Sequence, residues 1–110
     1  MEIKNFIQEW HSITDEVIEF KNIDISNLQK MFRETLNVIK EFSDENLIPK
    51  EIVKLLLEIN NFGWWVSELE DTPLHRRYQE IVSLIYTLNK YFFTNEIDIN
   101  DIETDIENIK

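Results

Sequence analysis

The sequence predicts an all-α protein, an antiparallel four-helix bundle with a short fifth C-terminal helix. The 110 residues contain one Gly and two Pro, and a β-sandwich or barrel of this length needs more turn residues than that. Apolar residues instead recur every three or four positions, which is the period of an amphipathic helix. We expect one helical domain over residues 1–110, because the length is typical of a single domain and no linker interrupts the pattern.

The first helix is predicted over Glu2–Phe20, where one face is apolar and the opposite face is rich in acids. The second is predicted over residues 24–42. Asp24 is a plausible N-cap, and Ile23 and Leu28 have the spacing of a hydrophobic staple. The apolar stripe of the first helix consists of Ile3, Phe6, Ile7, Trp10, Ile13, Val17 and Phe20.

The third helix is predicted to begin at Pro49, a residue favoured at the first helical position. It is apolar on more than one face, which is typical of a central helix. Gly63 lies inside it at a cost of about 1 kcal/mol relative to Ala, and marks either a kink or a close approach by another helix. The apolar positions are Ile52, Val53, Leu55, Leu56, Ile59, Phe62, Val66 and Leu69.

Two more helices complete the prediction. The fourth is expected to begin at Thr72-Pro73, an N-cap followed by Pro at the first helical position. The fifth is expected to begin at Asp98, with Ile102, Ile106 and Ile109 at helical spacing. The apolar positions of the fourth are Leu74, Tyr78, Ile81, Val82, Ile85, Leu88 and Phe92.

The chain carries 22 acids against 11 bases, a net charge of −11. This charge predicts a basic protein partner and argues against nucleic acid or an anionic membrane. The one basic cluster, residues 75–77, lies among acids, and Arg76 is predicted to pair with Glu80 one turn along. The N-terminus lacks a signal-peptide pattern and the apolar runs are too short to span a bilayer, so a cytoplasmic protein is expected.

Motifs for catalysis are missing from the sequence. There is no Cys, and one Gly cannot build a phosphate-binding loop. The two His residues, His11 and His75, do not occur in the spacings of zinc or di-iron ligand sets, and His11 beside Asp15 is interpreted as a surface pair. We therefore expect no enzyme activity, no cofactor and no metal.

The stretch Phe62-Gly63-Trp64-Trp65-Val66 is the strongest candidate for a binding site. Adjacent helical positions point about 100° apart, so these side chains cannot all face one core. An exposed Trp beside carboxylates resembles a protein-binding hot spot, whereas two buried Trp would be structural, and the sequence leaves both interpretations open. The candidate partner-binding residues are Trp64, Trp65, Glu68, Glu70 and Asp71.

A second candidate is the acidic C-terminal segment. Residues 96–110 contain six acids and one base, a net charge of −5, which leaves −6 for the other 95 residues. The segment is either an electrostatic patch for a basic partner or a solvated helix face. The candidate residues are Asp101, Glu103, Asp105 and Glu107.

The acid excess, the helical stripes from Ile3 to Phe92 and the aromatic and acidic stretch Trp64–Asp71 together resemble the small acidic all-helical immunity proteins. Those proteins neutralise bacterial nuclease toxins. The resemblance implies a non-catalytic inhibitor that covers the basic nucleic-acid cleft of a toxin. Helical immunity proteins against pore-forming bacteriocins are similar in length but tend to be basic, and this chain differs from them in that respect.

Two alternatives remain open. A phage-type inhibitor could mimic nucleic acid with spaced carboxylates, and it would compete with DNA while depending little on Trp64 or Trp65. A structural module could self-associate into a homo-oligomer through Ile102, Ile106 and Ile109 as its seam, and it would form a stable oligomer without any partner.

Overall fold

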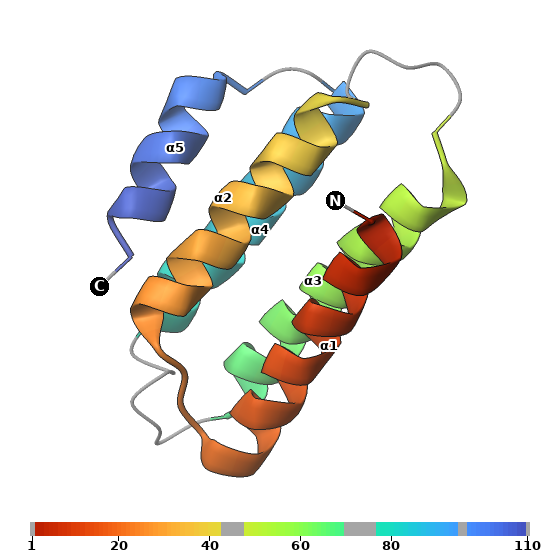
Figure 1. The fold of residues 1–110 in the computed structure, drawn as a ribbon. Helices are drawn as coiled ribbons and strands as arrows, with labels where there is room; N and C mark the ends of the chain where they lie inside the picture. Colours follow the sequence, from red (N-terminus) through yellow and green to blue (C-terminus); the bar gives the residue numbers. More distant parts are fainter. Residues whose placement is uncertain (1, 43–47, 70–76, 95–96, 110) are drawn as a thin grey trace.

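Five α-helices make up the described part of the chain, residues 2–42, 48–69, 77–94 and 97–109 of a computed structural model (Figure 1). No strand occurs within these ranges, so the predicted all-α class with a short fifth helix is confirmed. No helix in the same ranges has both the length and the apolar character needed to cross a membrane. The helices are α1 (Ile3–Phe20), α2 (Ile25–Lys40), α3 (Lys50–Glu68), α4 (Tyr78–Thr94) and α5 (Ile99–Glu107).

Two helix starts confirm the predicted caps. Asp24 Oδ1 accepts a hydrogen bond from the backbone N–H of Ser26 at 2.9 Å, and Asp98 Oδ1 accepts one from Asn100 at the same distance. Each carboxylate therefore satisfies an amide that has no partner inside its helix. Pro49 precedes α3 as its N-cap and is not its first residue.

The predicted start of the fourth helix, at residues 72–73, lies outside the described residues. The described part of α4 ends at Thr94, where the sequence predicts that the fourth helix frays.

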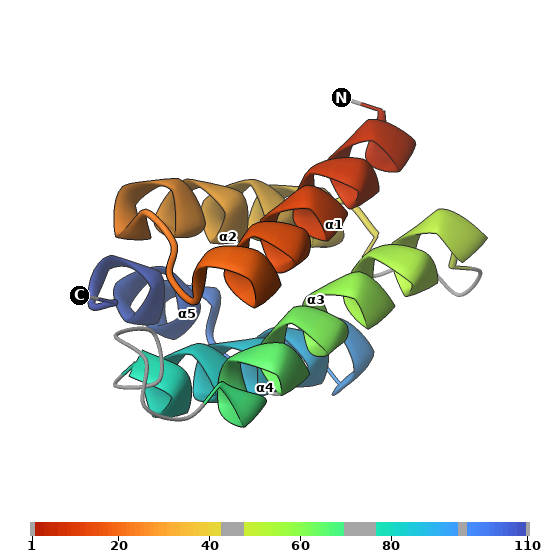
Figure 2. The same ribbon diagram turned by 90° about the horizontal axis from the view of Figure 1, so that it is seen from below.

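The helices form two layers, with α1 and α2 in one and α3 and α4 in the other (Figure 2). Consecutive helices alternate in direction, as predicted (Figure 1). The most extensive packing joins α1 and α3, which are not consecutive and run in the same direction, and the next joins α3 and α4. Helix α3 therefore lies against both α1 and α4, while α2 makes only a small contact with α4.

The core centres on Trp10, whose side chain is completely buried. Its ring contacts Phe32 of α2 at a centroid distance of 5.2 Å and Phe62 of α3 at 5.3 Å. Edge-to-face and tilted contacts at this distance are the favoured geometries for aromatic pairs. One side chain from α1 thus joins three helices, although α1 and α2 are splayed apart in the figures.

Gly63 lies where α3 and α4 approach each other. A Cβ at this position would be 2.8 Å from Cδ1 of Ile85 on α4. Helix α3 continues unbroken on both sides of the glycine. The interpretation of Gly63 as a close approach between helices is therefore confirmed.

Helix α5 belongs to the core, packed against both α2 and α4. Ile102, Ile106 and Ile109 are buried. The side-chain amide of Gln29 on α2 donates to the carbonyl oxygens of Ile106 and Ile109, at 3.2 and 3.0 Å. The prediction that these three isoleucines form a seam between copies is wrong, because the chain's own helices already cover them.

Candidate functional site

The two adjacent tryptophans of α3 have different surroundings. Phe62 and Val66 point into the core and are fully buried, while 54% of the Trp64 side chain is exposed and Trp65 is half-buried. The two indole rings meet edge to face, with centroids 4.9 Å apart. Of the two interpretations left open by the sequence, burial of both tryptophans is therefore wrong.

Glu68 is exposed at the last position of α3, four residues after Trp64. Side chains four apart on a helix lie on one face, so the structure brings this aromatic residue and this carboxylate together. Glu70 and Asp71 lie outside the described residues. Within the described chain, the first candidate site therefore consists of Trp64 and Glu68, with Trp65 beside them.

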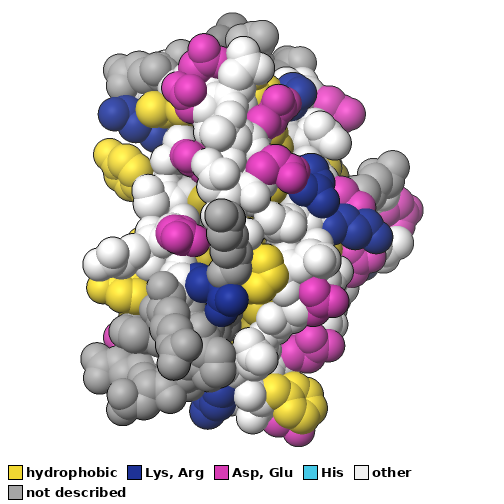
Figure 3. All heavy atoms as spheres, turned by 90° about the vertical axis from the view of Figure 1, so that its left-hand side faces the viewer, with side chains coloured by type: hydrophobic (Ala, Val, Ile, Leu, Met, Phe, Trp, Pro, Cys, Tyr) yellow, Lys and Arg dark blue, Asp and Glu magenta, His cyan; other side chains and the backbone are white. Residues whose placement is uncertain are grey.

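The four acidic candidates of α5 are exposed, and they divide into two pairs. Glu107 forms an ion pair with Arg33, and Glu103 lies 3.9 Å from Nζ of Lys40. Both bases belong to α2, so these two carboxylates help to hold α5 on α2. Figure 3 shows acidic and basic side chains close together on this side of the molecule, and not a surface of one sign.

Asp101 and Asp105 lie on the opposite flank of α5. Asp105 and Asn108 line a shallow hollow together with Glu80 and Ser83 of α4. Asp105 and Glu80 thus bring acids of two helices to one place, and this part of the C-terminal candidate keeps its acidic character. Helix α4 lies between α5 and α3 (Figure 2), so the two candidate sites do not form one surface.

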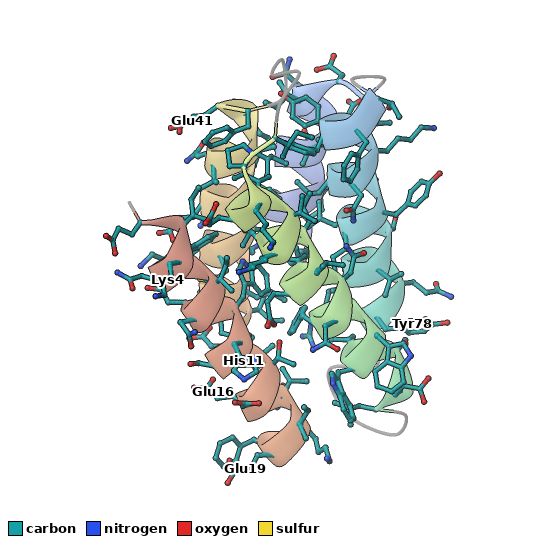
Figure 4. All side chains as sticks on the ribbon, turned by 90° about the vertical axis from the view of Figure 1, so that its right-hand side faces the viewer. Lys4, His11, Glu16, Glu19, Glu41 and Tyr78 are labelled. Atoms are coloured by element: carbon teal, nitrogen blue, oxygen red, sulfur yellow. The ribbon has the colours of Figure 1, made fainter. Side chains whose placement is uncertain are left out.

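His11 is exposed on α1 between two carboxylates. Its Nε2 lies 3.6 Å from Asp15, and its Nδ1 lies 3.3 Å from Glu58 of α3. Figure 4 shows this histidine partway along α1, with Glu16 and Glu19 further toward the end of the same helix. No group of three His, Cys, Asp or Glu side chains in the described ranges is placed to hold a metal ion. The arrangement is a polar contact between α1 and α3.

Sequence reasoning missed a group of exposed apolar side chains on the neighbouring helices α3 and α4. Val53 and Val82 were assigned to the core stripes, yet the structure exposes both of them. Each valine is the first of three exposed apolar residues on its helix, and both sets of three have the spacing i, i+4, i+11. We call this the α3–α4 surface, and its apolar members are Val53, Leu57 and Trp64 of α3 with Val82, Tyr86 and Phe93 of α4.

Asn60 and Asn89 join the two helices in the middle of the α3–α4 surface. Each side-chain amide donates to the side-chain oxygen of the other, at 3.3 and 3.2 Å. Each also donates to the carbonyl four residues earlier in its own helix, Leu56 at 2.7 Å and Ile85 at 2.8 Å. The sequence did contain a signal for the α3–α4 surface. Each of the two helices carries a second series of apolar residues besides the buried one, and a helix with only one buried face does not need a second series.

Comparisons of the chain with protein-family models, with curated proteins and with solved structures give no match.

Proposed function

We propose that this protein is a non-catalytic acidic inhibitor of the immunity-protein type, which binds and neutralises a basic bacterial toxin with nuclease activity in the cytoplasm. The observation that carries the proposal is the exposure of Trp64 on a helix whose neighbouring positions are buried. Buried Phe62 and Val66 hold the backbone of α3 in place, so the indole is presented to solvent on a rigid support. Glu68 lies one turn away on the same face.

Binding would proceed in two steps. The net charge of −11 attracts a basic partner, and electrostatic steering of this kind raises association rates by about 10–1000-fold at low salt. The exposed indole then becomes buried in the contact, where a Trp anchor contributes about 2 kcal/mol or more. Asp101 and Asp105 form a second acidic patch that extends the attraction to another side of the molecule.

Glu103 and Glu107 have a different part in this proposal. Because they pair with Lys40 and Arg33 of the same chain, a partner would have to compete with those bases. Their removal is expected to loosen α5 as well as to change the surface charge. Asp101 and Asp105 are the better pair for testing electrostatic attraction alone.

The test is co-expression of the tagged protein with the products of its neighbouring genes, followed by purification at low salt and at about 0.5 M salt, where the screening length falls to roughly 4–5 Å. We expect a basic, toxic protein to co-purify one-to-one and to be lost or weakened at high salt. A complex that DNA displaces and that tolerates Trp64→Ala would favour the nucleic-acid mimic instead.

Two variants make the test specific. Trp64→Ala is expected to weaken the complex by about 30-fold or more, which corresponds to about 2 kcal/mol. The matched control is Phe20→Ala on α1, which removes an aromatic side chain that is 67% exposed and belongs to neither candidate site. Equal affinity of the two variants, or the recovery of no basic partner from any neighbouring gene, would contradict the proposal.

A further inference from the structure

The α3–α4 surface is too extensive to be a scatter of exposed apolar side chains. The exposed fractions of Leu57, Tyr86 and Phe93 are 63%, 64% and 58%, and Trp64 adds its indole. Single exposed apolar residues are common on proteins, but several large ones gathered on two neighbouring helices are typical of an interaction site. The reciprocal Asn60–Asn89 pair lies inside this patch and binds its two helices together.

The exposed charged residues of α3 lie at the two ends of this surface. On α3, Lys50 and Lys54 are exposed at the N-terminal end, and Glu68 is exposed at the C-terminal end. A helix face with bases at one end and an acid at the other is complementary to a second copy of itself that is turned end over end.

The positions of the large side chains have the same symmetry. Leu57 and Trp64 are equally far from the midpoint between Asn60 and Asn61 of α3. Tyr86 and Phe93 are equally far from the midpoint that follows Asn89 on α4. Helices α3 and α4 run in opposite directions, and the Asn60–Asn89 pair aligns the two midpoints. One two-fold axis across both helices therefore relates all four side chains.

We propose that the α3–α4 surface binds a second copy of this chain about that axis. Leu57 packs against Trp64 of the second copy, and Tyr86 packs against Phe93 of the second copy. Glu68 of one copy then lies opposite Val53 of the second copy, and Lys50 and Lys54 of the second copy lie on either side of this carboxylate. Two-fold symmetry makes every contact occur twice, as in most homodimers.

Charge selects this axis over the other possible one. A two-fold axis parallel to the helices would lay α3 on α4 of the second copy and keep Glu68 at the opposite end from Lys50 and Lys54 of that copy, so these opposite charges would not meet. With the proposed axis, which crosses the helices, Lys90 is the one charged residue of the described surface that comes close to the same residue of the second copy. It is half-buried, and it lies about 100° around α4 from Asn89, on the side turned away from α3.

Salt separates this proposal from the proposed function. Two chains of charge −11 repel each other, so screening by salt should strengthen the dimer, whereas it should weaken a complex with a basic partner. Trp64 takes part in both contacts, so a basic partner has to displace the second copy. Either proposal can fail while the other stands, because the dimer is measured on the isolated chain.

The first experiment is sedimentation equilibrium of the full chain from about 1 µM to 1 mM, at about 0.05 and 0.5 M NaCl, where the screening length changes by about threefold. We expect the mass to rise with concentration from 13.4 kDa to twice that value, at lower concentrations in the higher salt. A monomer under all these conditions would overturn the proposal. Leu57→Asp should abolish the dimer, and Phe20→Asp, on α1 and not among the members of the surface, should preserve it.

Charge reversal tests the axis itself. Lys54→Glu and Glu68→Lys should each weaken the dimer by about 3–10-fold, a range typical of exposed ion pairs. An equimolar mixture of these two variants should regain the affinity of the unaltered chain, because every 54–68 contact then joins opposite charges. A dimer that survives Leu57→Asp, or variants that do not rescue each other in the mixture, would show that another surface is used.

Discussion

The indole N–H of Trp10 donates a hydrogen bond to the hydroxyl of Thr35 at 3.0 Å, in the interior of the protein. Neither side chain has measurable exposure. Thr35 in turn donates to the carbonyl oxygen of Met31 at 2.7 Å, within α2. The chain thus satisfies the one polar atom of its largest core residue and, with the same bond, connects α1 to α2.

Replacing the hydroxyl of Thr35 tests this bond. Thr35→Val keeps the shape of the side chain but leaves the indole N–H of Trp10 buried without a partner, so we expect the free energy of unfolding to fall by about 1–3 kcal/mol. Chemical denaturation measures it. Thr35→Ser retains the hydroxyl and loses only a methyl group, so it should be the milder change. Equal stability of Thr35→Val and the unaltered chain would show that the bond contributes nothing.

A second prediction concerns the contact between Gly63 and Ile85. Gly63→Ala gains about 1 kcal/mol of helix propensity, but its Cβ meets Cδ1 of Ile85 at 2.8 Å, and overpacking of this kind costs about 1–3 kcal/mol. We expect a net loss of up to about 2 kcal/mol in the free energy of unfolding.

Ile85→Val removes the very atom that collides, so it provides the control. In a double-mutant cycle, the coupling between Gly63→Ala and Ile85→Val should be favourable by at least about 0.5 kcal/mol. Strictly additive effects would mean that the two helices separate enough to accept the methyl group.

A third prediction concerns α5, which packs as part of the core. Ile106→Ala should lower the free energy of unfolding by about 2–5 kcal/mol, the usual cost of truncating a buried isoleucine. Asp105→Asn on the same helix should change it by less than about 0.5 kcal/mol, since Asp105 is exposed. Thermal denaturation compares them. Equal stability of the two variants would mean that α5 detaches before the rest of the protein unfolds.

The fourth prediction separates the tryptophans. Trp10→Ala should cost about 3–5 kcal/mol of stability, whereas Trp64→Ala should cost less than about 1 kcal/mol because most of this indole is already in water. Acrylamide quenching of the intrinsic fluorescence provides a second readout. Removing Trp64 should eliminate the most accessible component of the quenching. A large loss of stability in Trp64→Ala would assign this residue to the core and contradict its proposed role as an anchor.

Asp24 and Asp98 illustrate what sequence alone predicts well. Each cap depends on a carboxylate and an amide two residues later, so a few neighbouring residues determine it. The same is true of the helical class and of the approximate helix ends. Apolar spacing also identified the isoleucines of α5, but the alternative that made them a seam between copies was wrong, because they are buried within the chain.

Val53 and Val82 show where such reasoning fails. Both lie in apolar series, and both are exposed, because a series does not reveal which of its members will meet another helix. The same limit applied to Trp64 and Trp65, whose exposure depends on how α3 is turned between α1 and α4. The acids of α5 also looked equivalent until Arg33 and Lys40 were found beside Glu107 and Glu103.

The sequence by itself determined that this chain forms capped amphipathic helices with a strongly negative charge, because caps, helical periods and charges depend on residues within one or two turns. The tertiary structure alone decided that α1 packs on α3, that α5 completes the core, and that Leu57, Trp64, Tyr86 and Phe93 remain on the surface. Those outcomes depend on contacts between residues far apart in the chain. Which face of a helix becomes buried therefore depends on how all the helices pack together around one core.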